Sequence, residues 1–163
     1  MKSNIKDVRL QHFDRIRGYL EKLKIEEIIE DQEKYVIDIP FPFEFISGEK
    51  IALLIRFFIM EKWILTKCLI LLAKQIPKNL QNSIMKSLLQ SNFQYPEVTF
   101  SMDLESNIYL EIDMIPSINF KTFESEFKSI HFGIKHFYNV IISNIDKKMS
   151  KQNTFKEFKM LYS

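Results

Sequence analysis

The sequence predicts an α+β fold: a single domain with an antiparallel sheet covered by helices, in the order α-β-β-β-α-β-β-α. Two neighbouring apolar runs, Ile51–Ile59 and Trp63–Leu72, are rich in the β-branched and aromatic residues that strands prefer. Val98–Met114 alternates apolar and polar residues around a polar centre, which is typical of a hairpin. From Phe120 to Ile145, apolar residues recur at steps of three and four, which predicts a long helix.

The N-terminal part is expected to supply one helix and the first strand. Apolar residues between Ile5 and Leu23 fall roughly along one stripe of a helix. Tyr35–Phe43 alternates apolar residues as a strand does, and its prolines, Pro40 and Pro42, either end the strand or mark it as an edge strand.

The runs Ile51–Ile59 and Trp63–Leu72 could together be mistaken for a membrane span. Glu61 and Lys62 fall at the centre of that stretch, where charge is most costly in lipid. Two strands joined by a tight turn are the better interpretation. Both faces of each run are largely apolar, so we expect helices, a second subunit or both to cover the sheet on two sides.

This surplus of apolar strand surface is the first indication of function. Apolar surface in excess of what three helices can cover favours an interface with another chain. The candidate residues for a dimer or client surface are Phe57, Phe58, Trp63 and Leu65. The pattern leaves open which face of Ile51–Ile59 points to the core.

The centre of the predicted hairpin raises the question of a metal or catalytic site. Polar residues alternate there as the first ligands of a calcium loop would: Asp103, Glu105 and Asn107. The sixth and twelfth positions of such a loop hold Ile108 and Met114, where an EF-hand requires Gly and Glu. Glu111 and Asp113 alternate with apolar residues, as on the solvated face of a strand. We therefore interpret the stretch as a hairpin.

The sequence contains no recognisable enzyme site. His131 and His136 are five residues apart, about 140° around a helix, whereas paired ligands lie three or four apart. His12 lies on another helix, and Cys68 lies in the middle of a strand, where a buried thiol is seldom a nucleophile. The sequence predicts no catalytic residue, no cofactor and no metal ligand.

Composition sets the broad class of protein. A chain of 163 residues fits one domain, and a net charge of +2 does not draw it strongly to nucleic acid or membrane. The single cysteine, Cys68, indicates a reducing compartment. The opening segment MKSNIKDVRLQHFDR lacks the apolar core of a secretory signal. We therefore expect a cytoplasmic protein without a membrane partner.

Two basic regions suggest a nucleic-acid contact as a second interpretation. The first helix carries Lys2, Lys6, Arg9, Arg15, Arg17, Lys22 and Lys24. The C-terminal tail adds Lys147, Lys148, Lys151, Lys156 and Lys159, with Phe155, Phe158 and Tyr162 available for base stacking. The acidic residues between Glu26 and Glu33 interrupt a continuous positive stripe, so a solvated helix face is the simpler interpretation.

The chain also resembles a known family in its order of elements and its hydrophobic pattern. The segments that carry the resemblance are YVIDIPF, IALLIRFFIMEKWILTKCLILLAKQIP, NLQNSIMKSLLQSNFQ, PEVTFSMDLESNIYLEIDM and the Phe-rich final helix. Together they resemble the type III secretion chaperone-like fold and, within it, the YbjN-like family. The resemblance implies such a domain at residues 1–147 and leaves residues 148–163 as a basic tail or short helix.

Proteins of this kind are typically non-enzymatic homodimers. The secretion chaperones bind extended segments of client proteins, and the YbjN-like branch is linked to stress and regulation. We therefore expect a homodimeric, non-enzymatic protein-interaction or chaperone-like module with a protein client. The alternative is a nucleic-acid-associated regulator that uses the basic first helix and tail.

Overall fold

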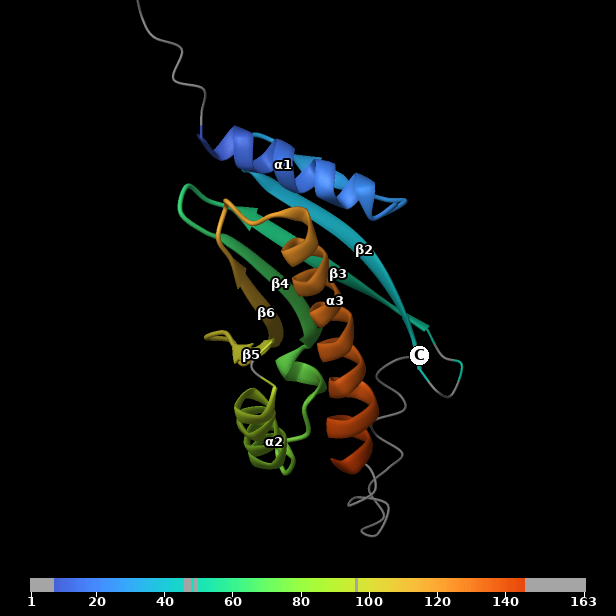
Figure 1. The fold of residues 1–163 in the computed structure, drawn as a ribbon. Helices are drawn as coiled ribbons and strands as arrows, with labels where there is room; N and C mark the ends of the chain where they lie inside the picture. The colour runs from blue at the N-terminus through green and yellow to red at the C-terminus, as the bar shows by residue number, and fades with distance from the viewer. Residues whose placement is uncertain (1–7, 46–47, 49, 96, 146–163) are drawn as a thin grey trace, which may run out of the picture.

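A computed structural model describes residues 8–45, 48, 50–95 and 97–145, and Figure 1 shows their arrangement. The elements are α1 (Val8–Lys22), β1 (Ile29–Asp31), β2 (Val36–Glu44), β3 (Lys50–Ile59), β4 (Ile64–Leu71), η1 (Ala73–Gln75), α2 (Gln81–Gln94), β5 (Thr99–Met102), β6 (Ile108–Met114), α3 (Phe120–His136) and η2 (Phe137–Ile142). The predicted order of helices and strands is confirmed. The structure adds the short strand β1 and the helical segments η1 and η2.

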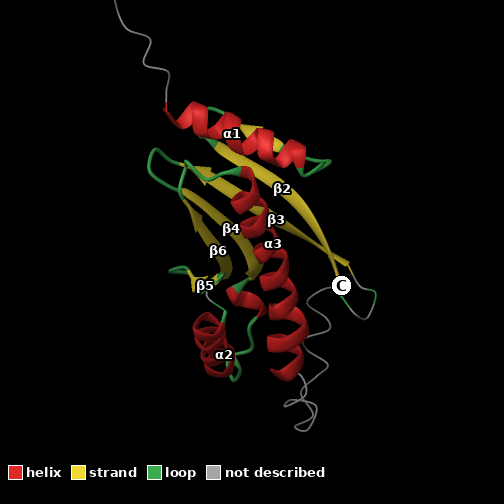
Figure 2. Ribbon diagram, in the orientation of Figure 1, coloured by secondary structure: helices red, strands yellow, loops and turns green. Residues whose placement is uncertain are grey.

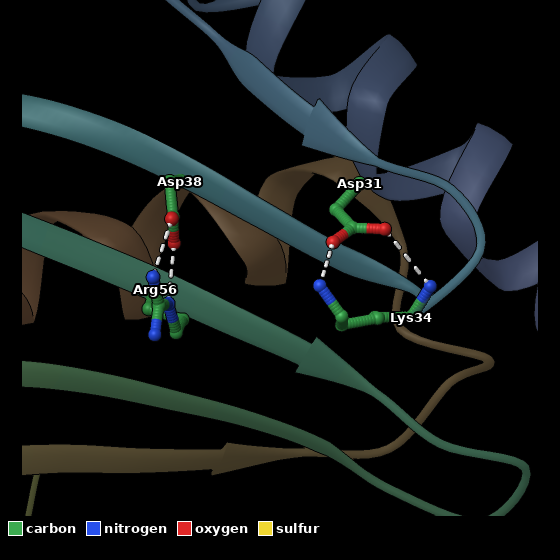
Figure 3. A network of polar contacts seen from close by, with 4 residues as sticks. All are labelled: Asp31, Lys34, Asp38 and Arg56. Atoms are coloured by element: carbon green, nitrogen blue, oxygen red, sulfur yellow. Dashed lines mark hydrogen bonds and ion pairs between the residues drawn. The ribbon is translucent and has the colours of Figure 1, made fainter.

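The described strands form one antiparallel sheet in the order β1-β2-β3-β4-β6-β5 (Figure 2). The hydrophobic pattern did not predict β1, because Ile29–Asp31 is short and acidic. Its turn into β2 is closed by Asp31, whose carboxylate accepts hydrogen bonds from the backbone N–H and the Nζ of Lys34 (Figure 3). Tyr35 then adopts a positive φ of 54°.

The helices of the described chain cover one face of the sheet, the inner face (Figure 1). Alternate residues of β3 and β6, among them Ile55, Phe57, Ile108 and Leu110, are buried there. In the described chain no helix covers the opposite face, so of the expected alternatives cover by a second subunit stays a prediction. Charged residues pair across neighbouring strands on that face and make it less apolar than the runs suggested.

Helix α3 lies along the inner face and carries the predicted apolar stripe. Phe123, Ile130 and Ile134 are at most 2% exposed, whereas Phe132 is 47% exposed, so the predicted phase of the helix is confirmed. At Gly133 a Cβ atom would lie 2.7 Å from Cδ1 of Leu110. The missing side chain therefore lets α3 approach β6 closely.

The helix continues into the π-helical segment η2, which the sequence pattern did not predict. A π-helix has more residues per turn than an α-helix, so neighbouring positions can face the core together. Phe137, Tyr138, Ile141 and Ile142 are all buried. The Tyr138 hydroxyl donates a hydrogen bond of 2.6 Å to the Ile70 carbonyl, which ties this end of the helix to β4.

Helix α1 is fixed to the loop between β6 and α3. Arg15 donates to the Pro116 carbonyl, and the Tyr19 hydroxyl donates to the Ile118 carbonyl at 3.1 Å. The Tyr19 ring also packs against Phe123, with 5.3 Å between the ring centroids. These contacts hold α1 against the N-terminal half of α3.

The β5–β6 connection is a hairpin, as predicted. Asp103 Oδ1 accepts the backbone N–H of Glu105 at 2.9 Å and that of Asn107 at 2.8 Å. Asp103 Oδ2 accepts the Asn107 side-chain amide at 3.0 Å. Ser106 has a positive φ of 67°. The carboxylate of Asp103 thus closes the loop on itself, and its hydrogen bonds, above all that of the Asn107 side chain, lower the Asp103 pKa.

The stripe on α3 leads to a stability prediction. Ile134→Ala should lower the free energy of unfolding by roughly 2–5 kcal/mol, because it opens a cavity in the core. Phe132→Ala should cost about 1 kcal/mol or less, because that ring is half exposed. Urea titration followed by circular dichroism measures both. A larger loss for Phe132→Ala would contradict the observed packing of α3.

The hairpin leads to a second prediction, on pH dependence. Asp103→Ala should lower the urea midpoint at neutral pH, because the loop loses three acceptor contacts. The lowered Asp103 pKa means that this contribution is present above the ordinary aspartate pKa, about 4, and is lost as the pH falls through the folded-state value. The two chains should therefore converge in stability in acid.

Calorimetric titration with calcium is the control for this interpretation. We expect the native chain and the double variant Asp103→Ala/Glu105→Ala to show no stoichiometric binding. Micromolar binding by the native chain that the double variant loses would contradict a purely structural role for the loop.

Candidate functional site

The outer face of the sheet, opposite α3, is the first candidate surface. It contains a hollow of about 660 Å³ lined by Leu54, Arg56, Phe58, Lys67, Leu69, Ser101, Met102, Asp103, Tyr109 and Glu111. Leu54 is 39% exposed and Met102 47% exposed. The hollow spans β3, β4, β6 and β5, so the strands themselves form its floor.

The charged residues of this outer face stand in one row across the strands. Asp38 lies opposite Arg56, Arg56 opposite Lys67, and Lys67 opposite Glu111. Arg56 Nε and Nη2 each donate to the Asp38 carboxylate at 2.7 Å (Figure 3), and Asp38 raises the Arg56 pKa. Lys67 Nζ lies 2.7 Å from Glu111 Oε1. The two cations at the centre of the row are therefore each neutralised by a flanking carboxylate.

Apolar side chains flank this charged row on both sides. Phe58 faces Leu65 across β3 and β4, and Leu69 faces Tyr109 across β4 and β6. The Arg56 guanidinium lies 5.9 Å from the centre of the Phe58 ring, so the charged row and the apolar rows are in contact. An exposed apolar surface with internally paired charges suits contact with another protein.

The structure separates the four residues predicted to form a partner surface. Phe58 and Leu65 lie half-buried on the outer face, and Trp63, 55% exposed, lies between β3 and β4. Phe57 is 0% exposed and packs between Phe123 and Phe127 of α3. Phe57 therefore belongs to the core and not to a partner surface, because strand neighbours point to opposite faces.

A second surface lies between α2 and the C-terminal end of the α3–η2 helix. It is a groove of about 770 Å³ lined by Lys86, Ser87, Leu89, Gln90, Ser91, Phe93, Gln94, His136, Val140, Ile141 and Asn144. Phe93 is 90% exposed, Leu89 65% and Val140 43%. Apart from one lysine and one histidine, the lining residues are neutral.

Sequence reasoning missed this groove, although it contained a signal. The buried stripe of α2 runs through Ile84 and Leu88. Leu89 and Phe93 lie four residues apart and off that stripe, so they form a second apolar row on the helix. A second apolar row on a short helix indicates a surface that packs against something beyond its own sheet.

The histidines do not form a common site. His131 packs its ring edge-on against Phe41 of β2, and burial, with a smaller effect from Lys135, lowers its pKa. His136 faces α2, where its Nε2 lies 3.0 Å from Ser91 Oγ, and burial lowers its pKa too. Among the described residues, no group of three His, Cys, Asp or Glu side chains is placed to hold a metal ion.

Cys68 is buried on the inner face, as expected. It is 1% exposed, and burial raises the pKa of its thiol to about 12. A thiol with such a pKa carries almost no thiolate at neutral pH, and the thiolate is the reactive form. The position therefore suits packing and not nucleophilic chemistry.

The basic residues of α1 within the described range make contacts inside the chain. Arg9 lies over the Tyr35 ring at 4.3 Å, Arg15 bonds the Pro116 carbonyl, and Arg17 lies 3.6 Å from Glu21. The cations at positions 2 and 6 and the lysines of the tail lie outside the described residues. No described helix has both the length and the apolar character that a membrane crossing requires.

Comparison with known proteins identifies the fold. No family model matches the chain, and no curated protein is significantly similar to it. Its structure is similar to a chain of the HopA1–SchA chaperone–effector complex, with a TM-score of 0.55 and 9% identity over 82% of this chain and 98% of that chain. It is also similar to a chain of the ExsC–ExsE complex, with a TM-score of 0.50 and 12% identity over 86% of this chain and 97% of that chain.

At these identities the likeness concerns the fold. It supports the chaperone-like fold of type III secretion chaperones that the sequence resembles. Membership of the YbjN-like family stays a prediction. The chain has the type III secretion chaperone-like fold.

Proposed function

We propose that this protein is a non-enzymatic, chaperone-like module that binds a partner protein through the outer face of its sheet. One observation carries the proposal: in the described chain, helices cover the inner face, while the outer face exposes apolar side chains around a hollow of about 660 Å³. The similarity to chains from a chaperone–effector complex supports the same class of function.

The chemistry of the outer face favours a protein over a charged polymer. Its cations, Arg56 and Lys67, are already paired with Asp38 and Glu111. Phosphate binding would have to compete with these carboxylates, whereas an apolar segment can lie on Phe58 and Leu69 and leave the ion pairs intact. An extended client segment with apolar residues at alternate positions would direct them all to one side, toward the apolar rows of the outer face.

The proposal includes a homodimer, and the groove beside α2 supports it. Phe93 of α2, 90% exposed, lines the groove together with Val140 and Asn144. A two-fold axis brings the same patch of both copies together, so a protruding ring beside a hollow can fill the hollow of its partner. The lining contains no carboxylate and one lysine, Lys86, so the two copies would repel each other little.

The nucleic-acid alternative has less support in the described residues. Arg15 and Arg17 of α1 are engaged by a carbonyl and a carboxylate of the same chain. We further propose a cytoplasmic location, which the buried free thiol of Cys68 favours. A role in stress or regulation rests on the YbjN-like resemblance.

The third prediction tests the outer face as a client surface. The native chain should suppress light scattering from reduced insulin, used as a model client, and Phe58→Glu should weaken this at least about tenfold by replacing an apolar contact with a charge. Ile115→Glu is the matched control, since Ile115 is 54% exposed and lies outside the outer-face hollow. Suppression should persist at high salt, because the contact is apolar.

Two outcomes would contradict this assignment. Equal suppression by Phe58→Glu and the native chain would remove the outer face as the client surface. Suppression that disappears steeply with added salt would favour binding by the basic regions.

The fourth prediction tests the homodimer. Sedimentation equilibrium should show a native dimer at micromolar concentration, a folded monomer for Phe93→Glu and a dimer for Phe58→Glu. A carboxylate at position 93 opposes association, because it would lose its water and would replace the apolar ring that is proposed to fill the hollow of the partner. A native monomer at all concentrations would contradict the dimer, and a monomer from Phe58→Glu alone would place the dimer contact on the sheet.

A further inference from the structure

The last turn of α2 makes an unusual contact with the edge strand β5. Asn92 Oδ1 accepts the backbone N–H of Phe100 at 2.7 Å, and Asn92 Nδ2 donates to the carbonyl of Phe100 at 2.9 Å. One carboxamide therefore satisfies both backbone groups of the same residue. A backbone residue of a neighbouring antiparallel strand would make the same pair of bonds.

The register of the hairpin shows that these bonds point away from β6. The Asp103 N–H donates to the Asn107 carbonyl at 3.1 Å, which places Asp103 opposite Asn107 in a hydrogen-bonded pair. In an antiparallel ladder such pairs alternate, so the backbone groups of Thr99 and Ser101 bond β6. The backbone N–H and C=O of Phe100 therefore point away from β6. The Asn92 carboxamide thus occupies the place that an added strand would take at the β5 edge.

The opposite edge of the sheet is closed by a different device. The Tyr35 carbonyl accepts the backbone N–H of Ile59 at the start of the β2–β3 ladder. The backbone N–H and C=O groups at the even-numbered positions of β2 therefore point away from β3. Two of these positions, Pro40 and Pro42, have no N–H, and β1 pairs only with Val36–Asp38. The prolines therefore deprive this edge of donors.

The sequence of β5 gives that strand no protection of its own. Its four residues, Thr99–Met102, contain neither charge nor proline, which are the usual devices against edge pairing. Met102 is 47% exposed. Two copies of such a strand could pair about a two-fold axis, since an antiparallel edge is complementary to itself.

We propose that Asn92 protects the β5 edge from strand pairing. Its carboxamide bonds the backbone N–H and C=O of Phe100 and so prevents the β5 strand of a second copy from pairing with them. The protection of one element is thereby supplied by a side chain of another. The proposal concerns the backbone edge of β5 and does not rest on client binding, although Ser101 and Met102 of this strand also line the outer-face hollow.

The test replaces Asn92 by a side chain of similar size without hydrogen-bonding groups. In Asn92→Leu we expect the Phe100 amide to exchange with deuterium at least about tenfold faster, because its acceptor is gone. The Ser101 amide, which bonds β6, should keep its native rate. Sedimentation should show a species larger than that of the native chain. Asn82→Leu, at the exposed start of α2, is the matched control.

A double variant separates edge pairing from general loss of stability. Asn92→Leu/Met102→Lys should retain the fast Phe100 exchange but return to the native species, since an edge lysine opposes strand pairing. If Asn92→Leu does not fold, Asn92→Ala replaces it in both experiments, because alanine also lacks the hydrogen-bonding groups of the carboxamide.

Three outcomes would overturn the proposal. The first is a Phe100 exchange rate in the Asn92 variants within about twofold of the native rate, since a lost acceptor bond should accelerate exchange more than that. The second is an unchanged native species in those variants. The third is self-association that persists in the double variant, which would show that the larger species does not form through the β5 edge.

Discussion

The close packing of α3 on the inner face of the sheet is the constraint on which the rest of the structure depends. The helix can lie on β6 because Gly133 has no side chain, and aromatic residues such as Phe57 and Phe123 fill the space further along. Helix α1 is then held by the loop that leads into α3, and α2 packs beside its far end. With every described helix on one side, the other side of the sheet remains open to a partner.

The elements that depend on local pattern could be predicted from the sequence. The long helix has one apolar stripe with a spacing that no strand shares, and its phase follows from residues such as Ile130 and Ile134. The hairpin follows from the turn chemistry of Asp103 and Asn107. The strands β3 and β4 follow from their composition and from the charged turn between them.

Other features escaped prediction for physical reasons. In β3 both Phe57 and Phe58 are apolar, so alternation could not tell the core face from the outer face. The π-helical turn at Phe137–Ile142 contains residue types that an α-helix also contains, so the sequence pattern could not distinguish the two. The outer-face ion pairs and the Asn92–Phe100 contact depend on which strands and helices become neighbours, and that information is tertiary.

The contacts of α1 with the loop before α3 have a consequence for sequence divergence. Arg15 and Tyr19 donate to the backbone carbonyls of Pro116 and Ile118, which any residue at those positions would provide. The same holds for Tyr138 and Ile70. Where a side chain donates to a backbone carbonyl, the residue that provides the carbonyl can be replaced without loss of the hydrogen bond. A fold tied together in this way can keep its topology while its sequence drifts, which is consistent with structural neighbours that share only 9% and 12% of their residues with this chain.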